Sequence, residues 1–165
     1  MKAKKLTHVG SSGAARMVDV SAKPVSSREA RARGAVRMSA PALEAILLGN
    51  LPKGEVIATA RIAGIQAAKR TSELIPMCHP LLLTLIDVEC VPDRRLPGMR
   101  IEARVRCDGK TGAEMEALTA VAVAALTLVD MAKSADRWMT IEGVELVEKR
   151  GGKSGDQRRS ASVRP

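Results

Sequence analysis

The sequence predicts an α+β fold of the ferredoxin-like kind, in which an antiparallel sheet carries helices packed on one face. The first supporting observation is composition, because 165 residues with 45% hydrophobic and 27% charged residues are typical of one globular domain with its own core. The second is a pair of alternating segments joined by turn residues, which predicts an antiparallel hairpin. The third is the order from Ala30: strand, helices, strand, strand, helix, strand, the split βαβ pattern.

Side-chain periodicity predicts the first strand and the two helices that follow it. Small and apolar residues alternate with more polar positions from Ala30 to Met38, as in a half-buried strand. Ser39 is placed to cap a short helix that Gly49-Asn50 would end. A second helix is expected from Val56 to about Ser72, with one face of small residues that permits close packing. This face comprises Ala60, Ala63, Gly64, Ala67 and Ala68.

The hairpin is predicted for the segment from Leu82 to Cys107. One face of its first strand is expected to carry Leu82, Thr84, Ile86, Val88 and Cys90. In its second strand Met99, Ile101, Ala103, Val105 and Cys107 alternate strictly with charged residues, which predicts one buried and one solvent-facing side. The segment Pro92–Gly98 between the strands has the residue types of a turn.

The longest helix is predicted from Gly112 to about Ala135, and a last strand from about Met139 to Glu148. Alanine, leucine and valine cover most sides of this helix, so we expect it to be buried between the sheet and a second subunit. No apolar run approaches the roughly 18 residues that a membrane span needs. We therefore expect no membrane partner.

We expect a single catalytic domain from residue 16 to residue 156, which begins with a short strand at Met17–Val20. Residues 1–15 and 157–165 are small, polar or basic, and are expected to be mobile ends that add little to stability. Three cysteines without CxxC spacing, and no apolar leader segment, predict a reduced cytoplasmic protein.

The net charge of +9 is concentrated at the two ends of the chain. Residues 1–37 hold nine lysines and arginines against Asp19 and Glu29, and residues 149–165 hold six against Asp156. Phe and Tyr are absent and Trp138 is the only tryptophan, so the stacking surfaces of single-stranded nucleic-acid binders are missing. We therefore expect no specific nucleic-acid partner, although the basic ends would attract small polyanions.

Cys78-His79 lies in a loop bracketed by two prolines. The pair could ligate a metal, act as nucleophile and base, or simply form part of the loop. The only other histidine is His8 and no zinc-type spacing exists, so we expect no metal site. Adjacent residues also tend to point apart, which makes a catalytic dyad awkward. Hydrogen bonding by His79 in a pocket and a purely structural role remain as alternatives.

Gly152-Lys153-Ser154 looks like the end of a P-loop. Val147 stands where that motif needs a glycine, and no helix follows, so the P-loop interpretation fails. The segment is then either a glycine-rich anion site or a flexible turn.

Asp130 and Lys133 are three residues apart on the long helix and can touch. Such pairs usually lie on the surface, but apolar neighbours predict a buried setting in which each group perturbs the other's pKa. Glu116 lies on the same face as Asp130, about 21 Å away along the axis. One small substrate cannot contact both ends of that helix, so a site that uses both residues must combine two subunits.

Five blocks of the sequence resemble the MoaC family, the cyclic pyranopterin monophosphate synthases of molybdenum cofactor biosynthesis. They cover about residues 6–156, in order and with family-like spacing. The blocks are Met17–Lys23, Ala58–Thr71, Met77-Cys-His-Pro80, Gly109–Ala120 and Gly151-Gly-Lys-Ser-Gly-Asp156.

The resemblance implies a lyase of pterin biosynthesis. Its members convert (8S)-3′,8-cyclo-7,8-dihydroguanosine 5′-triphosphate, the product of a radical partner enzyme, into cyclic pyranopterin monophosphate and diphosphate. It also implies a homohexamer, a trimer of dimers, with active sites at the dimer interface. No cofactor is implied, although Mg²⁺ can arrive with the triphosphate.

The resemblance also assigns residues to the site. The implied catalytic residues are Asp130, Lys53 and Lys133. The implied substrate-binding residues are Met77, Cys78, His79, Glu114, Met115, Glu116 and Lys149.

Two departures from the family pattern are small. Met77 replaces a common leucine, and Arg150 replaces a common serine and adds a charge beside the proposed site. The alternatives to an enzyme are a nucleic-acid-binding module and a structural hexamer whose site a change such as Arg150 has silenced.

Overall fold

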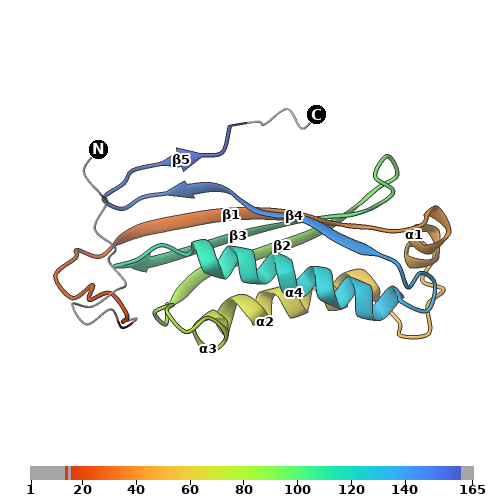
Figure 1. Cartoon of the computed structure of the whole chain (residues 1–165), viewed down its shortest axis with the longest axis horizontal. Helices are drawn as coiled ribbons and strands as arrows, with labels where there is room; N and C mark the ends of the chain where they lie inside the picture. Colours follow the sequence, from red (N-terminus) through yellow and green to blue (C-terminus); the bar gives the residue numbers. More distant parts are fainter. Residues whose placement is uncertain (1–13, 15, 161–165) are drawn as a thin grey trace.

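The protein consists of a five-stranded antiparallel sheet with helices against one face (Figure 1). This architecture confirms the predicted α+β class. The computed structural model describes residue 14 and residues 16–160. The strand order is β2-β3-β1-β4-β5, so the first four strands follow the ferredoxin-like arrangement. The elements are β1 (Ser26–Arg37), α1 (Ala40–Leu47), α2 (Val56–Lys69), α3 (Thr71–Leu74), β2 (Leu83–Asp93), β3 (Gly98–Gly109), α4 (Glu114–Ala132), β4 (Thr140–Arg150) and β5 (Gln157–Arg158).

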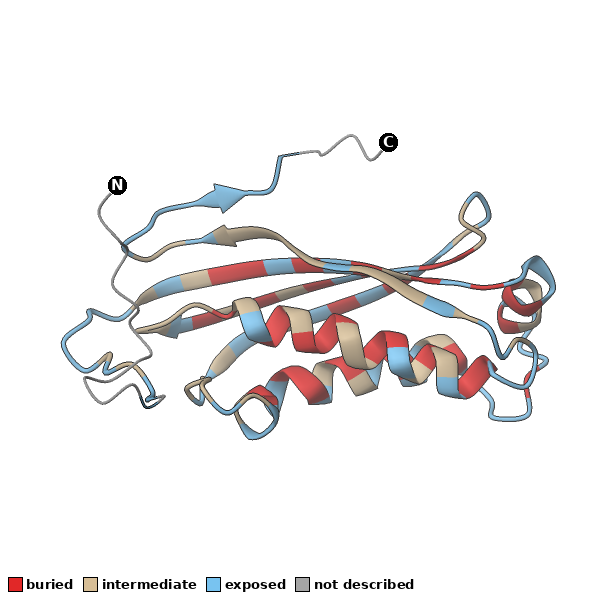
Figure 2. Cartoon of the chain, viewed as in Figure 1, coloured by how far each residue is buried: buried red, intermediate tan, exposed pale blue. Residues whose placement is uncertain are grey.

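The central strand β1 pairs with β3 on one side and β4 on the other. Its predicted alternation is confirmed, because Ala30, Ala32 and Val36 are at most 2% exposed while the arginines between them face solvent. The alternation of β3 is confirmed in the same way, from Met99 to Cys107. The banding of buried and exposed residues along these strands is visible in Figure 2.

Strand β2 departs from its predicted pattern at its beginning. Its pairing with β3 shifts register between Leu83 and Leu85. A bulge of this kind inserts one residue and reverses which side chains face the core. As a result Leu83 packs against the core, whereas Leu82 is 89% exposed and Thr84 is exposed. From Ile86 onward the expected face is correct.

Helices α2 and α4 pack against each other beneath the sheet, in close contact through small residues. The predicted small-residue face of α2 makes this contact, since Ala60, Gly64 and Ala67 are buried. A Cβ at Gly64 would lie 2.9 Å from the carbonyl oxygen of Ala120, so glycine permits the approach. The face of small residues therefore brings the two helices together.

Within the described residues, α4 is the one helix whose length and composition would suffice to cross a bilayer. No apolar run of this length is expected from the sequence. The helix passes the test because its many alanines keep the mean hydropathy high, although it has no continuous run of large apolar residues. More than half of its most apolar window, 56%, is buried inside the domain, as in the core helix of a soluble protein.

Two local predictions are wrong. Met17–Val20 forms no strand, and Val18 instead accepts a hydrogen bond from the ring of His79. Ser39 occupies the N-cap position of α1, but its hydroxyl makes no capping bond. Its backbone N–H donates to Asp136 at 2.8 Å, so an acidic side chain beyond α4 ties down this helix start.

The segment after Asp156 is held to the sheet at its beginning, although the sequence predicts a mobile tail from residue 157. Gln157–Arg158 form β5 and pair with Glu148 and Lys149 of β4. Arg159 then donates its backbone N–H to Val147 at 2.8 Å and its Nε to Leu146 at 3.0 Å. A strand of two residues is too short for its periodicity to be recognised in a sequence.

Two truncated chains test how much the paired part of this segment, β5, contributes to stability. A chain ending at Ser160 is expected to melt like the full chain. A chain ending at Asp156 should lose about 1 kcal/mol of net hydrogen bonding and melt about 2–4 °C lower. Thermal unfolding of both chains measures this difference, and equal melting temperatures would show that β5 adds nothing to stability.

Candidate active site

A cavity of about 300 Å³ opens at the amino-terminal end of α4. Three segments build it: the stretch before β1, the loop between α3 and β2, and the turn that leads from β3 into α4. Its lining residues are Val18, Val20, Lys23, Met77, Cys78, His79, Leu81, Thr111, Gly112, Glu114, Met115 and Glu116. The structure therefore brings six of the predicted substrate-binding residues together.

A hydrogen bond from His79 holds the stretch before β1 against this cavity. Its Nε2–H donates to the carbonyl oxygen of Val18 at 2.9 Å. The loop that carries it begins where the backbone N–H of Cys78 closes a turn on Ile75 at 3.0 Å. His79 thus forms a hydrogen bond at the cavity, which fits both the pocket role and the structural role that the sequence left open.

Cys78 lies in the same cavity as a protonated thiol. Burial, together with the negative charge of Glu116, raises the pKa of Cys78 above its ordinary value. A nucleophilic cysteine needs the opposite shift, since the thiolate is the reactive form. The cavity is therefore unsuited to a cysteine nucleophile, which the sequence also disfavours.

Glu116 is the only acidic residue of α4 that is buried, at 4% exposure. It begins the inward face of the helix, where the following residues, Ala117 and Ala120, are core. Burial raises the pKa of Glu116 to about 7. A carboxyl group with this pKa exchanges protons near neutral pH, as a general acid or base must.

The raised pKa of Glu116 predicts a dependence of stability on pH. Between about pH 4.5 and 7 the folded chain holds a proton that the unfolded chain has released, so the free energy of unfolding falls as pH rises. Glu116→Gln should remove this decline and melt higher than the wild type above pH 7. Melting temperatures from pH 4 to 9 test this, and parallel curves for the two proteins would contradict it.

Two basic residues, Lys149 and Arg28, lie beside the cavity on the sheet side, although neither is one of its lining residues. Lys149 of β4 lies 3.8 Å from Glu114 and donates to Ser154 at 2.5 Å. Arg28 of β1 lies nearby, and its Nε is buried without a hydrogen-bond partner among the described residues. One of its two terminal nitrogens, Nη2, reaches the Lys110 carbonyl only at 3.5 Å. A half-buried guanidinium with one unpaired, buried N–H is suited to an anion.

The glycines of the loop after β4 are required by this arrangement. Gly151 and Gly152 have φ of 85° and 79°, a backbone conformation that favours glycine. A Cβ on Gly152 would overlap the Arg28 guanidinium, and one on Gly151 would overlap the Ser27 carbonyl. The loop thus lies against Arg28, and its backbone can approach an anion closely.

Arg150 lies on the opposite side of the sheet from Lys149, because successive residues of a strand face opposite ways. It pairs with Glu148, with its Nη2 at 2.8 Å from the carboxylate. The extra charge noted in the sequence is therefore neutralised locally and lies away from the cavity. This removes the main reason to regard the site as silenced.

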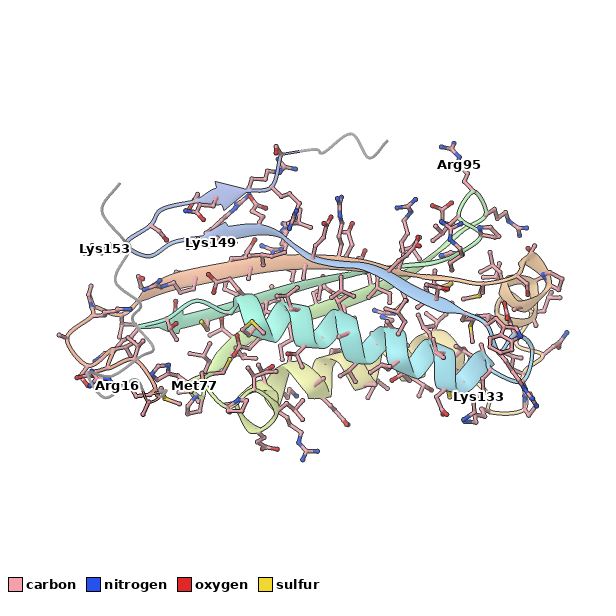
Figure 3. All side chains as sticks on the ribbon, in the orientation of Figure 1. Arg16, Met77, Arg95, Lys133, Lys149 and Lys153 are labelled. Carbon is pink, nitrogen blue, oxygen red and sulfur yellow. The ribbon has the colours of Figure 1, made fainter. Side chains whose placement is uncertain are left out.

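The three predicted catalytic residues form a separate cluster at the other end of α4. Asp130 accepts from Lys133 at 2.7 Å and from Lys53 at 2.6 Å. Lys53 comes from the turn before α2 and also donates to the Asp130 carbonyl at 3.1 Å. In Figure 3, Lys133 lies at one end of the molecule and Met77, Lys149 and Lys153 at the other.

The setting of this cluster corrects a prediction. The side chains of Asp130, Lys53 and Lys133 are 55%, 43% and 58% exposed, so the pair is not buried as its apolar neighbours suggest. Leu128 and Met131 turn toward the core, whereas Leu126 is exposed and Asp130 points outward. The two ammonium groups, Lys133 first, lower the pKa of Asp130 to about 2. Within one chain Asp130 is therefore a fixed negative charge that keeps both lysines in place.

Sequence reasoning missed several residues of the cavity. Lys23, Thr111 and Gly112 fall inside the blocks that carry the resemblance, which was the available signal. The sequence also offered a way to find Arg28, because it is the one charged residue at the positions of β1 that face inward. No group of three or more His, Cys, Asp or Glu side chains suited to a metal occurs among the described residues. His8 lies outside them.

Comparison with known proteins agrees with the geometry. Residues 17–152 match the model of the MoaC family. The cyclic pyranopterin monophosphate synthase of Methylobacterium sp. (strain 4-46) is 60% identical over 150 residues, which cover 91% of this chain and 94% of that protein. The proteins of the same name from Brucella ovis and Brucella melitensis are 59% identical over 152 residues, 92% of each chain. A match over this length, with these identities, means that the chain belongs to the MoaC family.

Proposed function

We propose that this chain, a cyclic pyranopterin monophosphate synthase of molybdenum cofactor biosynthesis, builds its active site from two subunits. The family match and the identity of about 60% over nine-tenths of the chain support the activity. The substrate is the 3′,8-cyclo-7,8-dihydroguanosine triphosphate, and the products are cyclic pyranopterin monophosphate and diphosphate. A radical enzyme of the preceding step supplies the substrate.

The observation that carries a composite site is the separation of its two halves along α4. Glu116 and Asp130 are 14 residues apart, about 21 Å at 1.5 Å per residue. A nucleotide-sized substrate in the cavity at Glu116 cannot reach Asp130 of the same chain. A two-fold axis near the middle of α4 would pair the helices antiparallel and bring the Asp130 cluster of one subunit to the cavity of the other.

The exposed side of α4 supports this pairing. Met115, Leu126, Asp130 and Lys133 share that side, and Leu126 is 58% exposed although it lies on a core helix. Ile62 of α2 is also exposed, at 57%. An apolar surface with charged residues at one end is typical of a face that a second subunit covers. Three such dimers would make the homohexamer that the resemblance implies.

In the composite site the residues divide the chemistry between them. Lys53 and Lys133, held by Asp130, are placed to donate protons and to stabilise negative charge on the reacting skeleton. Glu116, with a pKa near 7, can accept or return a proton from the opposite side. Arg28, Lys149 and the loop after β4 are suited to the triphosphate and to the departing diphosphate. Met77, Cys78, His79 and Met115 shape the pocket.

No cofactor is needed in this proposal. Mg²⁺ would enter with the triphosphate, because such ions are commonly held by substrate phosphates and one or two carboxylates. We place the protein in the cytoplasm, where its three free cysteines, Cys78, Cys90 and Cys107, would stay reduced.

The decisive experiment supplies the purified chain with the cyclic triphosphate. An enzyme releases diphosphate and forms the tricyclic monophosphate in equal amounts. Unchanged substrate would contradict the activity and leave a structural hexamer. Binding to oligonucleotides without turnover would favour the nucleic-acid module, although the described sheet surface carries charged side chains and no aromatic ones. Size measurement by light scattering separately tests the hexamer.

A further inference from the structure

One buried carboxylate lies on the face of the sheet opposite the active site. Glu29 points outward from β1, by the alternation of that strand, yet it is only 8% exposed. Burial of a charge is costly unless it is paired and hydrogen-bonded. None of the functions described above uses this residue.

Three arginines surround Glu29 and cover it. Arg104 and Arg106 of β3 donate to its Oε2 at 2.7 and 2.8 Å. Arg31, two residues further along β1, donates to its Oε1 at 3.4 Å. The bonds from Arg104, first, and Arg106 lower the pKa of Glu29 to about 2, so the carboxylate stays charged at every physiological pH.

This cluster joins β1 to β3, and its Arg31 also lies 3.7 Å from Glu148 of β4, so it reaches both strands that carry Arg28 and Lys149. Glu29 stands opposite Arg106 on one side and Arg150 on the other. The neighbouring residues on the inner face are Arg28 of β1 and Lys149 of β4, which stands opposite Ala30. Arg28 is the third residue of β1, so the cluster lies near the end of the strand, where fraying is easiest.

Glu29 also separates charges that would otherwise repel. Arg31 stands directly opposite Arg104 in the pairing of β1 with β3. Like charges in this position destabilise a sheet unless a counter-charge lies between them. Without the carboxylate the first residues of β1 would move away from β3, and Arg28 would move with them.

We infer that Glu29 is a positioning residue of the active site, which holds Arg28 and Lys149 in place for the phosphates from the far side of the sheet. The inference rests on the proposed phosphate-binding role of Arg28 and Lys149. It adds a residue that touches neither the cavity nor the substrate.

Diphosphate, the product, is the probe that tests this role. Glu29→Gln should weaken diphosphate binding and raise the KM of the cyclic triphosphate by about tenfold, the low end of the losses seen when outer-shell partners are removed. The kcat should change less, because the Asp130 cluster is untouched. Calorimetric titration and steady-state kinetics, well below the melting temperature of each variant, give both values.

Glu145→Gln is the matched control. Glu145 of β4 lies on the same outer face, is 16% exposed, and pairs with Arg33 of β1 at 2.6 Å, so it joins β1 to its other neighbour further along the strand. Its variant should leave diphosphate binding unchanged. Equal weakening by both variants would reduce Glu29 to a general stabiliser of the sheet and overturn the inference.

A double-mutant cycle shows whether Glu29 acts through Arg28. The Arg28→Ala/Glu29→Gln protein should lose less diphosphate binding than the sum of the two single losses, because only the part of the Glu29 effect that acts through Lys149 remains. Additive losses would contradict the inference. If Arg28→Ala binds diphosphate more weakly but Glu29→Gln binds it normally, only the positioning role of Glu29 is overturned. If Arg28→Ala binds diphosphate normally, Arg28 does not bind phosphate, and both proposals fail. If Glu29→Gln does not fold, Glu29→Asp, which keeps the charge, should show an intermediate loss against the same control.

Discussion

Asp130→Asn is expected to lower turnover of the cyclic triphosphate by at least about a hundredfold, the scale of a lost acid–base function. Asn keeps the shape of the side chain but removes the charge that binds Lys133 at 2.7 Å and Lys53 at 2.6 Å. Both ammonium groups would then be free to move. Because all three side chains are exposed in the single chain, stability should change little. Steady-state rates and melting temperatures of the purified variant measure the two effects.

Glu73→Gln is the appropriate control for this variant. Glu73 pairs with Arg70 at 2.9 Å with the same spacing of three residues and is 61% exposed. It should leave turnover near the wild-type rate. If Asp130→Asn behaves like this control, Asp130 and Lys133 are an ordinary surface pair, and the catalytic assignment of the cluster is wrong.

Mixing two inactive variants is expected to restore activity. Glu116→Ala damages the cavity half of each site, and Asp130→Asn damages the lysine half. If each site combines the two halves from different subunits, a mixed dimer holds one site with both defects and one with neither. Random reassortment of equal amounts then returns about a quarter of the wild-type activity, because half the dimers are mixed and each has one intact site.

Subunit exchange has to be verified in the same mixture. Native mass spectrometry of the reassembled protein shows whether mixed dimers are present. As a control, two variants of the same half, Asp130→Asn and Lys53→Ala, should restore nothing when they are mixed. Proven exchange without recovered activity in the first mixture would mean that each site lies within one chain, and the pairing proposed for α4 would fail.

Local periodicity was sufficient for much of the fold. The alternation from Met99 to Cys107 predicted β3 and its buried face, and the apolar density after Gly112 predicted α4. These patterns are reliable because each depends on the repeat of one strand or one helix. The family resemblance also named six of the residues that line the cavity, because the matching blocks preserve the identity of particular side chains.

Elements that depend on a neighbouring segment could not be predicted this way. The bulge in β2 arises from its pairing with β3, and it turned Leu82 outward although its own alternation placed it inward. Strand β5 is only two residues long, and its pairing with β4 leaves no trace in its sequence. Val18 belongs to a segment that alternates like a strand, but the structure places Val18 in the lining of the cavity.

The sequence by itself predicted, through the family resemblance, which residues do the chemistry, and helix geometry determined that Glu116 and Asp130 lie too far apart on one helix. Only the tertiary structure decided their surroundings: Asp130 is exposed between two lysines, Glu116 is buried with a raised pKa, and Glu29 is covered by arginines on the far side of the sheet. The physical reason is that burial and pKa depend on side chains brought close from distant parts of the chain. A repeat along one strand or helix carries no record of those neighbours.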